Sequence, residues 1–467
     1  MVSFLQWVNS IVWGIPALAL IVGVGIYLTV KTRFVQIRLL PEAMRGFLGP
    51  LFGADSDLHR SKRRALYTAL AATVGTGNLA GVAGAIALGG PGAVFWMWIC
   101  GFLGMVTKFA EATLAICYRK RRENGEFTGG PMYMILRALR PRWHWLAYLY
   151  CFFGIVASFG VGNGTQINTV IGGINSALLS FGVEESFMRN LLIGLLLGML
   201  ICFVMSKGVI GIARAAEMLV PFAALLYVVI CATVLVLRVD AIPDAFRAII
   251  SGAFSPRAVT GGALGSFFVT LRVGASRGVF TNEAGMGTAC MAHATSATSD
   301  PVEQGLMGIV EVFIDTIVIC TLTAMVILTS GVFVPYGCDT GILLTTQAFV
   351  SVLGKWVSVF LSVCLCLFAF ATVLGWGLYG IQCARFLFGD GCIKTFVILQ
   401  SVMAVVSAVI NTGTLWLLAD IVNGLMAIPN LLVLSKLVPE VGVMVRTYDK
   451  RRLQKQAPKD QCVVTRV

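Results

Sequence analysis

Long apolar stretches alternate with short polar segments along almost the whole chain. Each stretch is close to the roughly 20 residues that cross the hydrocarbon core of a bilayer as a helix. The pattern predicts eleven spans, of which the fifth and the tenth are short. Their predicted ranges are Ile11–Val30, Ala65–Leu88, Gly92–Tyr118, Trp145–Ile171, Leu191–Val204, Met218–Leu237, Gly261–Phe280, Gln304–Leu328, Val357–Tyr379, Val397–Ile410 and Leu415–Leu434. We therefore expect an all-α polytopic membrane protein.

Two of these spans carry glycine-rich polar interruptions. The second contains "AATVGTGNLAG", and the seventh contains "TLRVGASRGVFTNEAGMGT". A glycine inside a helix costs about 1 kcal/mol relative to alanine, and unwound backbone at membrane depth persists only where protein lines a cavity. A small-residue packing face is the alternative, but Gly75–Asn78 covers all sides of a helix. We interpret that segment as an unwound break, whose free amides suit a carboxylate and whose free carbonyls suit sodium.

The two interrupted spans lie in separate halves of the chain. Such a pair is typical of a transporter built from an inverted repeat, with its binding site at the membrane midplane. Spans two to six and seven to eleven would then form two five-helix halves. The predicted division is an extra N-terminal helix and basic loop (1–64), a first repeat (65–260), a second repeat (261–435) and a basic tail (436–467).

Composition and charge agree with a membrane location. Of 467 residues, 58% are hydrophobic and 12% are charged, whereas soluble domains have about 25% charged residues. The net charge of +13 collects in the loop Lys31–Arg64, in the segment Arg119–Arg122 and in the tail. This distribution indicates a membrane surface and no nucleic-acid partner, and it predicts an outside N-terminus and a cytoplasmic C-terminus in the plasma (inner) membrane. The loop Gly287–Glu303 lacks lysine and arginine although the count places it inside.

Three polar or aromatic side chains inside other spans have two interpretations. Gln166 lies in the fourth span, and Thr372 and Trp376 lie four apart on one face of the ninth. Gln166 could line a cavity or bond to a neighbouring helix. The Thr372 hydroxyl could complete a cation shell and the Trp376 indole could limit side-chain size, or both could serve ordinary packing.

Charged residues inside spans are functional candidates, because they are costly there. Glu311 and Asp315 share a face of the eighth span and could carry protons. Lys108 and Glu111 lie three apart and are expected to pair with each other.

Arg277 and Glu283 lie beside the second interruption. We interpret them as salt-bridged residues near the inner face, with substrate contact as the alternative.

The sequence offers no assembled catalytic constellation. The three histidines, His59, His144 and His293, have no zinc-type spacing partners. "GTGN" lacks the lysine of a phosphate-binding loop, so we expect no ATPase function or partner. The thirteen cysteines are scattered without a CxxC pattern and are expected to be buried thiols. The N-terminus has no cleavage site and is expected to be a retained span.

Several long motifs resemble the alanine or glycine:cation symporters, within the amino acid–polyamine–cation transporter group. They are "TALAATVGTGNLAGVAGAIALGGPGAVFWMW", "GMVTKFAEATLA", "TGGPMY", "NEAGMGTA", "PVEQGLMGIVEVFIDT", "LFAFATVLGWGLYG" and "ADIVNGLMAIPN". The resemblance covers nearly the whole chain. It implies a leucine-transporter-like 5+5 inverted repeat of ten core helices with one extra N-terminal helix. It also implies symport of alanine or glycine with sodium, without an organic cofactor.

The resemblance also assigns site residues. The substrate-binding candidates are Gly75, Thr76, Gly77, Asn78, Gln166, Phe268, Gly274, Thr372 and Trp376. The sodium candidates are the carbonyl groups of Ala71 and Val74 and the hydroxyl of Thr372.

The sequence therefore predicts a sodium-coupled secondary transporter for a small neutral amino acid, and not an enzyme. One alternative is a proton-driven transporter that uses Glu311, Asp315 or Glu283. A polytopic membrane enzyme or a channel fits less well, because the enzyme would need a clustered reactive set and the channel a filter sequence, and the sequence shows neither pattern.

Overall fold

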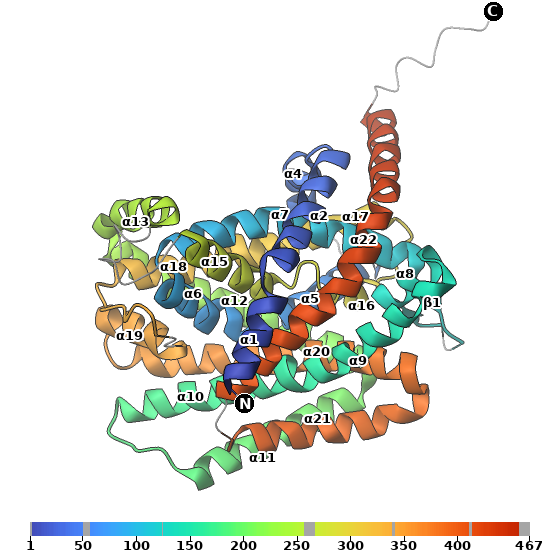
Figure 1. Cartoon of the computed structure of the whole chain (residues 1–467). Helices are drawn as coiled ribbons and strands as arrows, with labels where there is room; N and C mark the ends of the chain where they lie inside the picture. Colours follow the sequence, from blue (N-terminus) through green and yellow to red (C-terminus); the bar gives the residue numbers. More distant parts are fainter. Residues whose placement is uncertain are drawn as a thin grey trace, which may run out of the picture.

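The computed structural model describes residues 2–49, 57–123, 125–255, 267–338, 341–410 and 413–456. In these ranges the chain is a bundle of helices with one short hairpin (Figure 1). The predicted boundary between residues 260 and 261, the first residues of the seventh span and the end of the basic tail lie outside the described residues.

The described residues include nine helices long and apolar enough to cross a membrane, or ten if one bent pair counts as a single span. The bent pair is the predicted second span. The described part of the predicted seventh span, Gly261–Phe280, lies in one helix, Phe267–Asn282, whose 16 residues are too few for it to be counted. With that span added, the arrangement matches the predicted polytopic all-α class.

The first half contains the predicted spans two to six. Its elements are α5 (Asp57–Thr73), the π-helical η2 (Gly77–Gly81), α6 (Val82–Gly89), α7 (Gly92–Tyr118), α9 (Trp145–Phe159), the π-helical η4 (Gly160–Gly164), α10 (Thr165–Leu179), α11 (Phe187–Ser206) and α12 (Gly208–Leu237).

The second half contains the predicted spans seven to eleven. Its elements are α15 (Phe267–Asn282), α16 (Ala289–His293), α17 (Pro301–Val312), the π-helical η6 (Phe313–Cys320), α18 (Thr321–Thr329), α20 (Val357–Phe388), α21 (Ile393–Ser407) and α22 (Gly413–Gln456).

Helices at corresponding positions of the two halves pack against each other. The pairs are α7 with α17, α9 and α10 with α20, and α11 with α21; Figure 1 shows α11 and α21 side by side along one edge. Equivalent elements meet in this way when two repeats are related by an axis in the membrane plane. The residue bounds predicted for the four segments of the chain stay a prediction.

The remaining elements surround this core. They are α1 (Val2–Val12), α2 (Ile15–Lys31), α3 (Val35–Arg38), α4 (Leu40–Leu48), the strands β1 (Lys120–Arg121) and β2 (Phe127–Thr128), α8 (Pro131–Ala138), η3 (Pro141–Trp143), η5 (Val239–Ala241), α13 (Ile242–Phe254), α19 (Ile342–Leu353) and η7 (Asp390–Cys392). Helices α1 and α2 form the extra N-terminal span and pack on α22.

The eleventh span is far longer than its apolar stretch predicted. Helix α22 continues through Pro429 and Pro439 to Gln456 and projects beyond the bundle (Figure 1). Its projecting part is held by ion pairs to the N-terminal segment, Arg38 with Asp449 at 2.8 Å and Arg452 with Glu42 at 3.0 Å. A hydrophobicity pattern predicts where a helix leaves the bilayer, and it carries no information about where that helix ends in water.

Candidate functional site

The second span is broken where the sequence predicted. Helix α5 ends at Thr73, and the helix Gly77–Gly89 continues at an angle of 50° to it. At the bend the Gly75 N–H donates to Asn78 Oδ1 at 2.8 Å, and the Thr76 N–H donates to Gln166 Oε1 at 3.4 Å. Two side-chain amide oxygens therefore accept N–H groups that would donate to backbone carbonyls in a continuous helix.

This bend releases carbonyl groups at the end of α5. In a continuous helix the N–H groups of Gly75 and Thr76 would bond the carbonyls of Ala71 and Ala72, but here they point elsewhere. The carbonyl end of a half-helix carries a partial negative charge. The Thr372 hydroxyl lies at the same place, since a Cβ atom added to Gly75 would be 2.5 Å from its Oγ1. The geometry thus gathers oxygen atoms suited to a dehydrated cation.

Residues of α10 and α20 meet the first break. The Thr76 hydroxyl donates to Gln166 Oε1 at 2.9 Å, and the backbone of Gly162 lies directly against Trp376. Gln166 is 3% exposed, Thr372 2% and Trp376 1%. Helices α10 and α20 therefore bring Gln166 and Thr372 to the break predicted in the second span, and Trp376 lies beside η4.

The second interruption breaks at the end of the stretch that the sequence singled out, at Gly285 and Gly287 and not at Gly274 or Gly278. Helix α15 is continuous through Gly274 and Gly278 and ends at Asn282. Residues 283–288 are non-helical before α16, with positive φ at Glu283 (54°), Gly285 (91°) and Gly287 (75°).

Two candidates from the seventh span are corrected by this geometry. Phe268 is 75% exposed, far along α15 from the break. Gly274 faces the backbone of Ala93 in α7, where the missing side chain permits close helix packing. Phe280 and Thr281 take their place: a Cβ on Gly77 would lie 3.2 Å from Thr281 Cγ2 and 3.4 Å from the Phe280 ring. The last turn of α15 thus contacts the first break.

The peptide groups of the second break are held by Glu111 of α7. Its Oε1 accepts the N–H groups of Gly285 at 3.0 Å and Gly287 at 3.1 Å, and the Asn430 side-chain amide at 2.6 Å. Asn430 also donates to the Gly285 carbonyl at 2.9 Å. A carboxylate of the protein therefore occupies the donors of the second break, whereas neutral amide oxygens accept those of the first.

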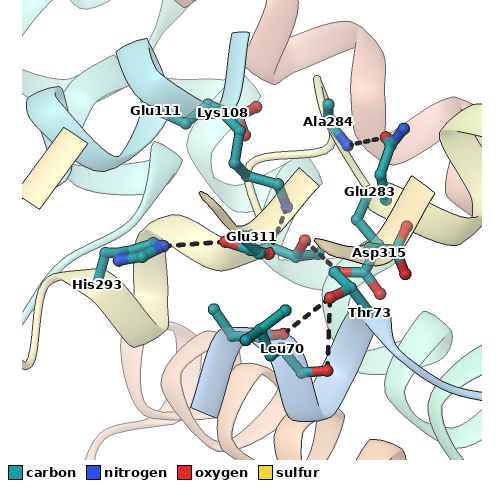
Figure 2. Close-up of polar contacts among 12 residues, drawn as sticks. Leu70, Thr73, Lys108, Glu111, Glu283, Ala284, His293, Glu311 and Asp315 are labelled. Atoms are coloured by element: carbon teal, nitrogen blue, oxygen red, sulfur yellow. Dashed lines mark hydrogen bonds and ion pairs between the residues drawn. The ribbon is translucent and has the colours of Figure 1, made fainter. Parts of the chain in front are cut away.

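The expected pair of Lys108 with Glu111 is therefore wrong. Lys108 Nζ instead lies 3.1 Å from Glu311 Oε1 across the α7–α17 interface. His293 Nε2 lies 3.0 Å from the other oxygen of Glu311, and the Gln304 amide is 2.8 Å from His293 Nδ1. Figure 2 shows Lys108 and His293 approaching Glu311 from different sides. The spacing of two residues on one helix could not reveal this partner on another.

Asp315 connects the two breaks. Its Oδ1 accepts the Asn78 amide at 2.6 Å, and its Oδ2 accepts the Thr316 hydroxyl at 2.8 Å. The Asn282 amide, at the end of α15, donates to the Thr316 hydroxyl at 3.1 Å. Sequence reasoning singled out Asp315 as a buried charge but missed its contact with Asn78.

The two charged residues beside the second break have separate partners. Arg277 lies 4.0 Å from Asp420 of α22, which agrees with the salt-bridged interpretation. Glu283 instead accepts the Thr288 hydroxyl at 2.6 Å.

Comparison with known proteins identifies relatives over nearly the full length. The model of the sodium:alanine symporter family matches residues 1–462. The sodium/alanine symporter AgcS of Methanococcus maripaludis is 40% identical over 457 residues, covering 97% of this chain and 98% of that protein. The probable sodium/glutamine symporter GlnT of Bacillus subtilis is 38% identical over 455 residues, covering 97% and 91%.

A solved structure has the same architecture. The crystal structure of MhsT in complex with L-phenylalanine aligns with a TM-score of 0.56 at 14% identity, covering 82% of this chain and 97% of that one. This likeness supports a leucine-transporter-like fold.

Proposed function

The chain belongs to the sodium:alanine symporter family, and from that premise we propose that it carries alanine or glycine into the cell together with sodium by alternating access. It is a multi-pass membrane protein that couples amino-acid transport to sodium, and it is not an enzyme. The observation that carries the proposal is the convergence of Gly75, Thr76, Gln166 and Thr372 at one unwound point.

The substrate carboxylate binds at the first break. In the structure the N–H groups of Gly75 and Thr76 donate hydrogen bonds to the side-chain oxygens of Asn78 and Gln166. These amide oxygens occupy the places that two carboxylate oxygens would take, at the positive end of the half-helix that begins at Gly77. Substrate binding then exchanges one set of oxygen acceptors for another.

Sodium binds on the other side of the same bend. The carbonyls of Ala71 and Val74 and the Thr372 hydroxyl are its ligands. Thr372 Oγ1 donates its proton to the Phe368 carbonyl at 3.0 Å, so its lone pairs are left for a cation. Because one bend carries both sites, filling either one organises the other, which is a reciprocal coupling.

Sodium is expected to increase alanine affinity. The test is binding of labelled alanine to the purified protein in sodium and in potassium, at equal ionic strength. A coupling of about 1–3 kcal/mol would give a 5- to 150-fold lower Kd in sodium. Equal affinities in the two salts would contradict the proposal.

Replacing Trp376 is expected to widen the substrate range. The indole is buried and packs against Gly162, so Trp376→Ala would remove the wall of the pocket without touching the first break. Uptake of larger neutral amino acids should rise in proteoliposomes, measured with a panel of labelled amino acids. Because a relative is named as a glutamine symporter, glutamine belongs in the panel. An unchanged substrate range would remove Trp376 from the pocket.

The orientation proposed from the loop charges is an outside N-terminus and a cytoplasmic C-terminus in the plasma (inner) membrane. One bundle rocks against the rest around the two breaks, so that the site opens to each side in turn. A proton-driven mechanism is the second candidate, because carboxyl groups are buried beside both breaks.

A further inference from the structure

Four buried carboxyl groups belong to α7, to the second break and to the eighth span. We call them the carboxyl cluster: Glu111, Glu283, Glu311 and Asp315. Three of them are 0% exposed and Glu283 is 3% exposed. Figure 2 shows Glu283, Glu311 and Asp315 gathered in one region with Lys108.

The charges in this region do not balance. Lys108 acts electrostatically on every member of the cluster, but its ion pair is with Glu311 alone. Even if His293 carried a proton beside Glu311, four negative groups would face two positive ones. An unpaired carboxylate costs several kcal/mol to bury, and inside a membrane such groups bind a proton or a cation.

A second observation points to an occupant. In the described part of the chain, Glu111 Oε2 and the Tyr379 hydroxyl are buried polar atoms without a hydrogen-bond partner. Tyr379, in α20, lies within the electrostatic reach of Glu283, Glu311 and Glu111. Buried polar atoms are nearly always partnered by protein, water or an ion. The lone pairs of these two atoms are therefore available to a small, positively charged guest.

We propose that the carboxyl cluster is a second cation site, separate from the sodium site of the first break. It takes up positive charge either as protons on the carboxyl groups or as one sodium ion held by Glu111 Oε2, Glu283 and the Tyr379 hydroxyl. The other titratable groups facing it are Lys108, His293, Tyr150, Cys320 and Cys290, whose thiol donates to the Glu111 carbonyl.

The position of this site links its occupancy to both breaks. Glu111 holds the peptide groups of the second break, and Asp315 holds Asn78 of the first. Trp376, the proposed pocket wall, is among the groups that act electrostatically on Glu283. A change of charge in the cluster would therefore act on both breaks. This inference deepens the proposed function by adding a second coupling charge, yet the binding itself can be measured without transport.

Infrared spectroscopy of the purified full-length protein tests the proton form. In sodium-free buffer at neutral pH we expect the C=O stretching band of a protonated carboxyl, shifted in D2O. Glu111→Gln and Glu283→Gln should each reduce this band. The matched control is Glu303→Gln in α17, since the Glu303 side chain is 39% exposed and paired with Lys62; this variant should leave the band unchanged.

Counting bound ²²Na by equilibrium dialysis tests the sodium form. Two sodium ions per chain without a protonated band, falling to one in Glu111→Gln or Glu283→Gln, would support sodium as the occupant. A protonated band in the wild type that is lost in these variants would support protons. The proposal is overturned if the wild type has no such band and binds at most one sodium, or if the variants leave both readouts unchanged.

The wild-type measurements decide the question even if a variant fails to fold. A band that disappears on adding sodium, but not potassium, would support exchange at the cluster. Sodium-independent alanine binding would contradict the proposed function of the first break and leave this spectroscopic result standing.

Discussion

Gly75→Ala is expected to abolish sodium-driven alanine uptake. The added Cβ would lie 2.5 Å from Thr372 Oγ1 and 3.3 Å from Gln166 Oε1, so it would enter the space where both proposed ligands meet. Since the methyl group obstructs the cation and the carboxylate together, uptake should fall by at least about a hundredfold, a loss of about 3 kcal/mol. The measurement is initial uptake of labelled alanine into proteoliposomes under an inward sodium gradient.

A second glycine substitution provides the matched control. Gly172 lies in α10, and nothing stands within 4 Å of the place where its Cβ would be. Gly172→Ala should retain normal uptake, and both variants should elute as folded protein from a size-exclusion column. Wild-type uptake by Gly75→Ala would show that the first break is not the site.

Asn78→Ala is expected to abolish transport while the protein stays folded in detergent. The Asn78 side-chain amide donates to Asp315 Oδ1 at 2.6 Å and so holds the start of the half-helix against the eighth span. Loss of a buried hydrogen bond to a charged group costs about 1.5–3 kcal/mol. In this variant the lost bond is one that stabilises the bend of the first break. Substrate affinity should fall about 10- to 100-fold, with uptake below detection at micromolar alanine.

The control for this variant is Asn175→Ala. Asn175 lies near the end of α10, where it bonds Glu185 and Arg189, away from both breaks. It should leave alanine affinity unchanged, and both variants should elute as folded protein from a size-exclusion column. Normal uptake by Asn78→Ala would remove this residue from the proposed site.

The first break could be predicted from the sequence because its cause is local. Two glycines weaken the helix at Gly75 and Gly77, and Asn78, three residues after Gly75, supplies the side chain that takes over a peptide N–H. Helical spacing likewise placed Thr372 and Trp376 on one face. These features need no knowledge of neighbouring helices.

The sequence located the second break only within a longer stretch that also contains Gly274 and Gly278. Gly274 and Gly278 face α7 and serve close helix packing, as small residues often do in membranes. The break lies at 283–288, where Glu111 and Asn430, far away in sequence, take up its peptide groups. The sequence alone does not distinguish a glycine that permits close helix packing from a glycine in an unwound segment. The difference depends on which helix faces it.

The partners of the buried charges were beyond the sequence for a related reason. Lys108 and Glu111 are neighbours on one helix, yet Lys108 reaches Glu311 and Glu111 reaches the second break. Which residue faces which helix depends on the rotation of α7 against α17 and α15, and the nearly uniform apolar character of these spans hides that rotation.

The most direct test is a structure of the protein with alanine and sodium bound. The account predicts density for the carboxylate at the N–H groups of Gly75 and Thr76, and for a cation between the Ala71 and Val74 carbonyls and the Thr372 hydroxyl. A continuous helix through residues 73–77, or alanine bound elsewhere in the bundle, would contradict it.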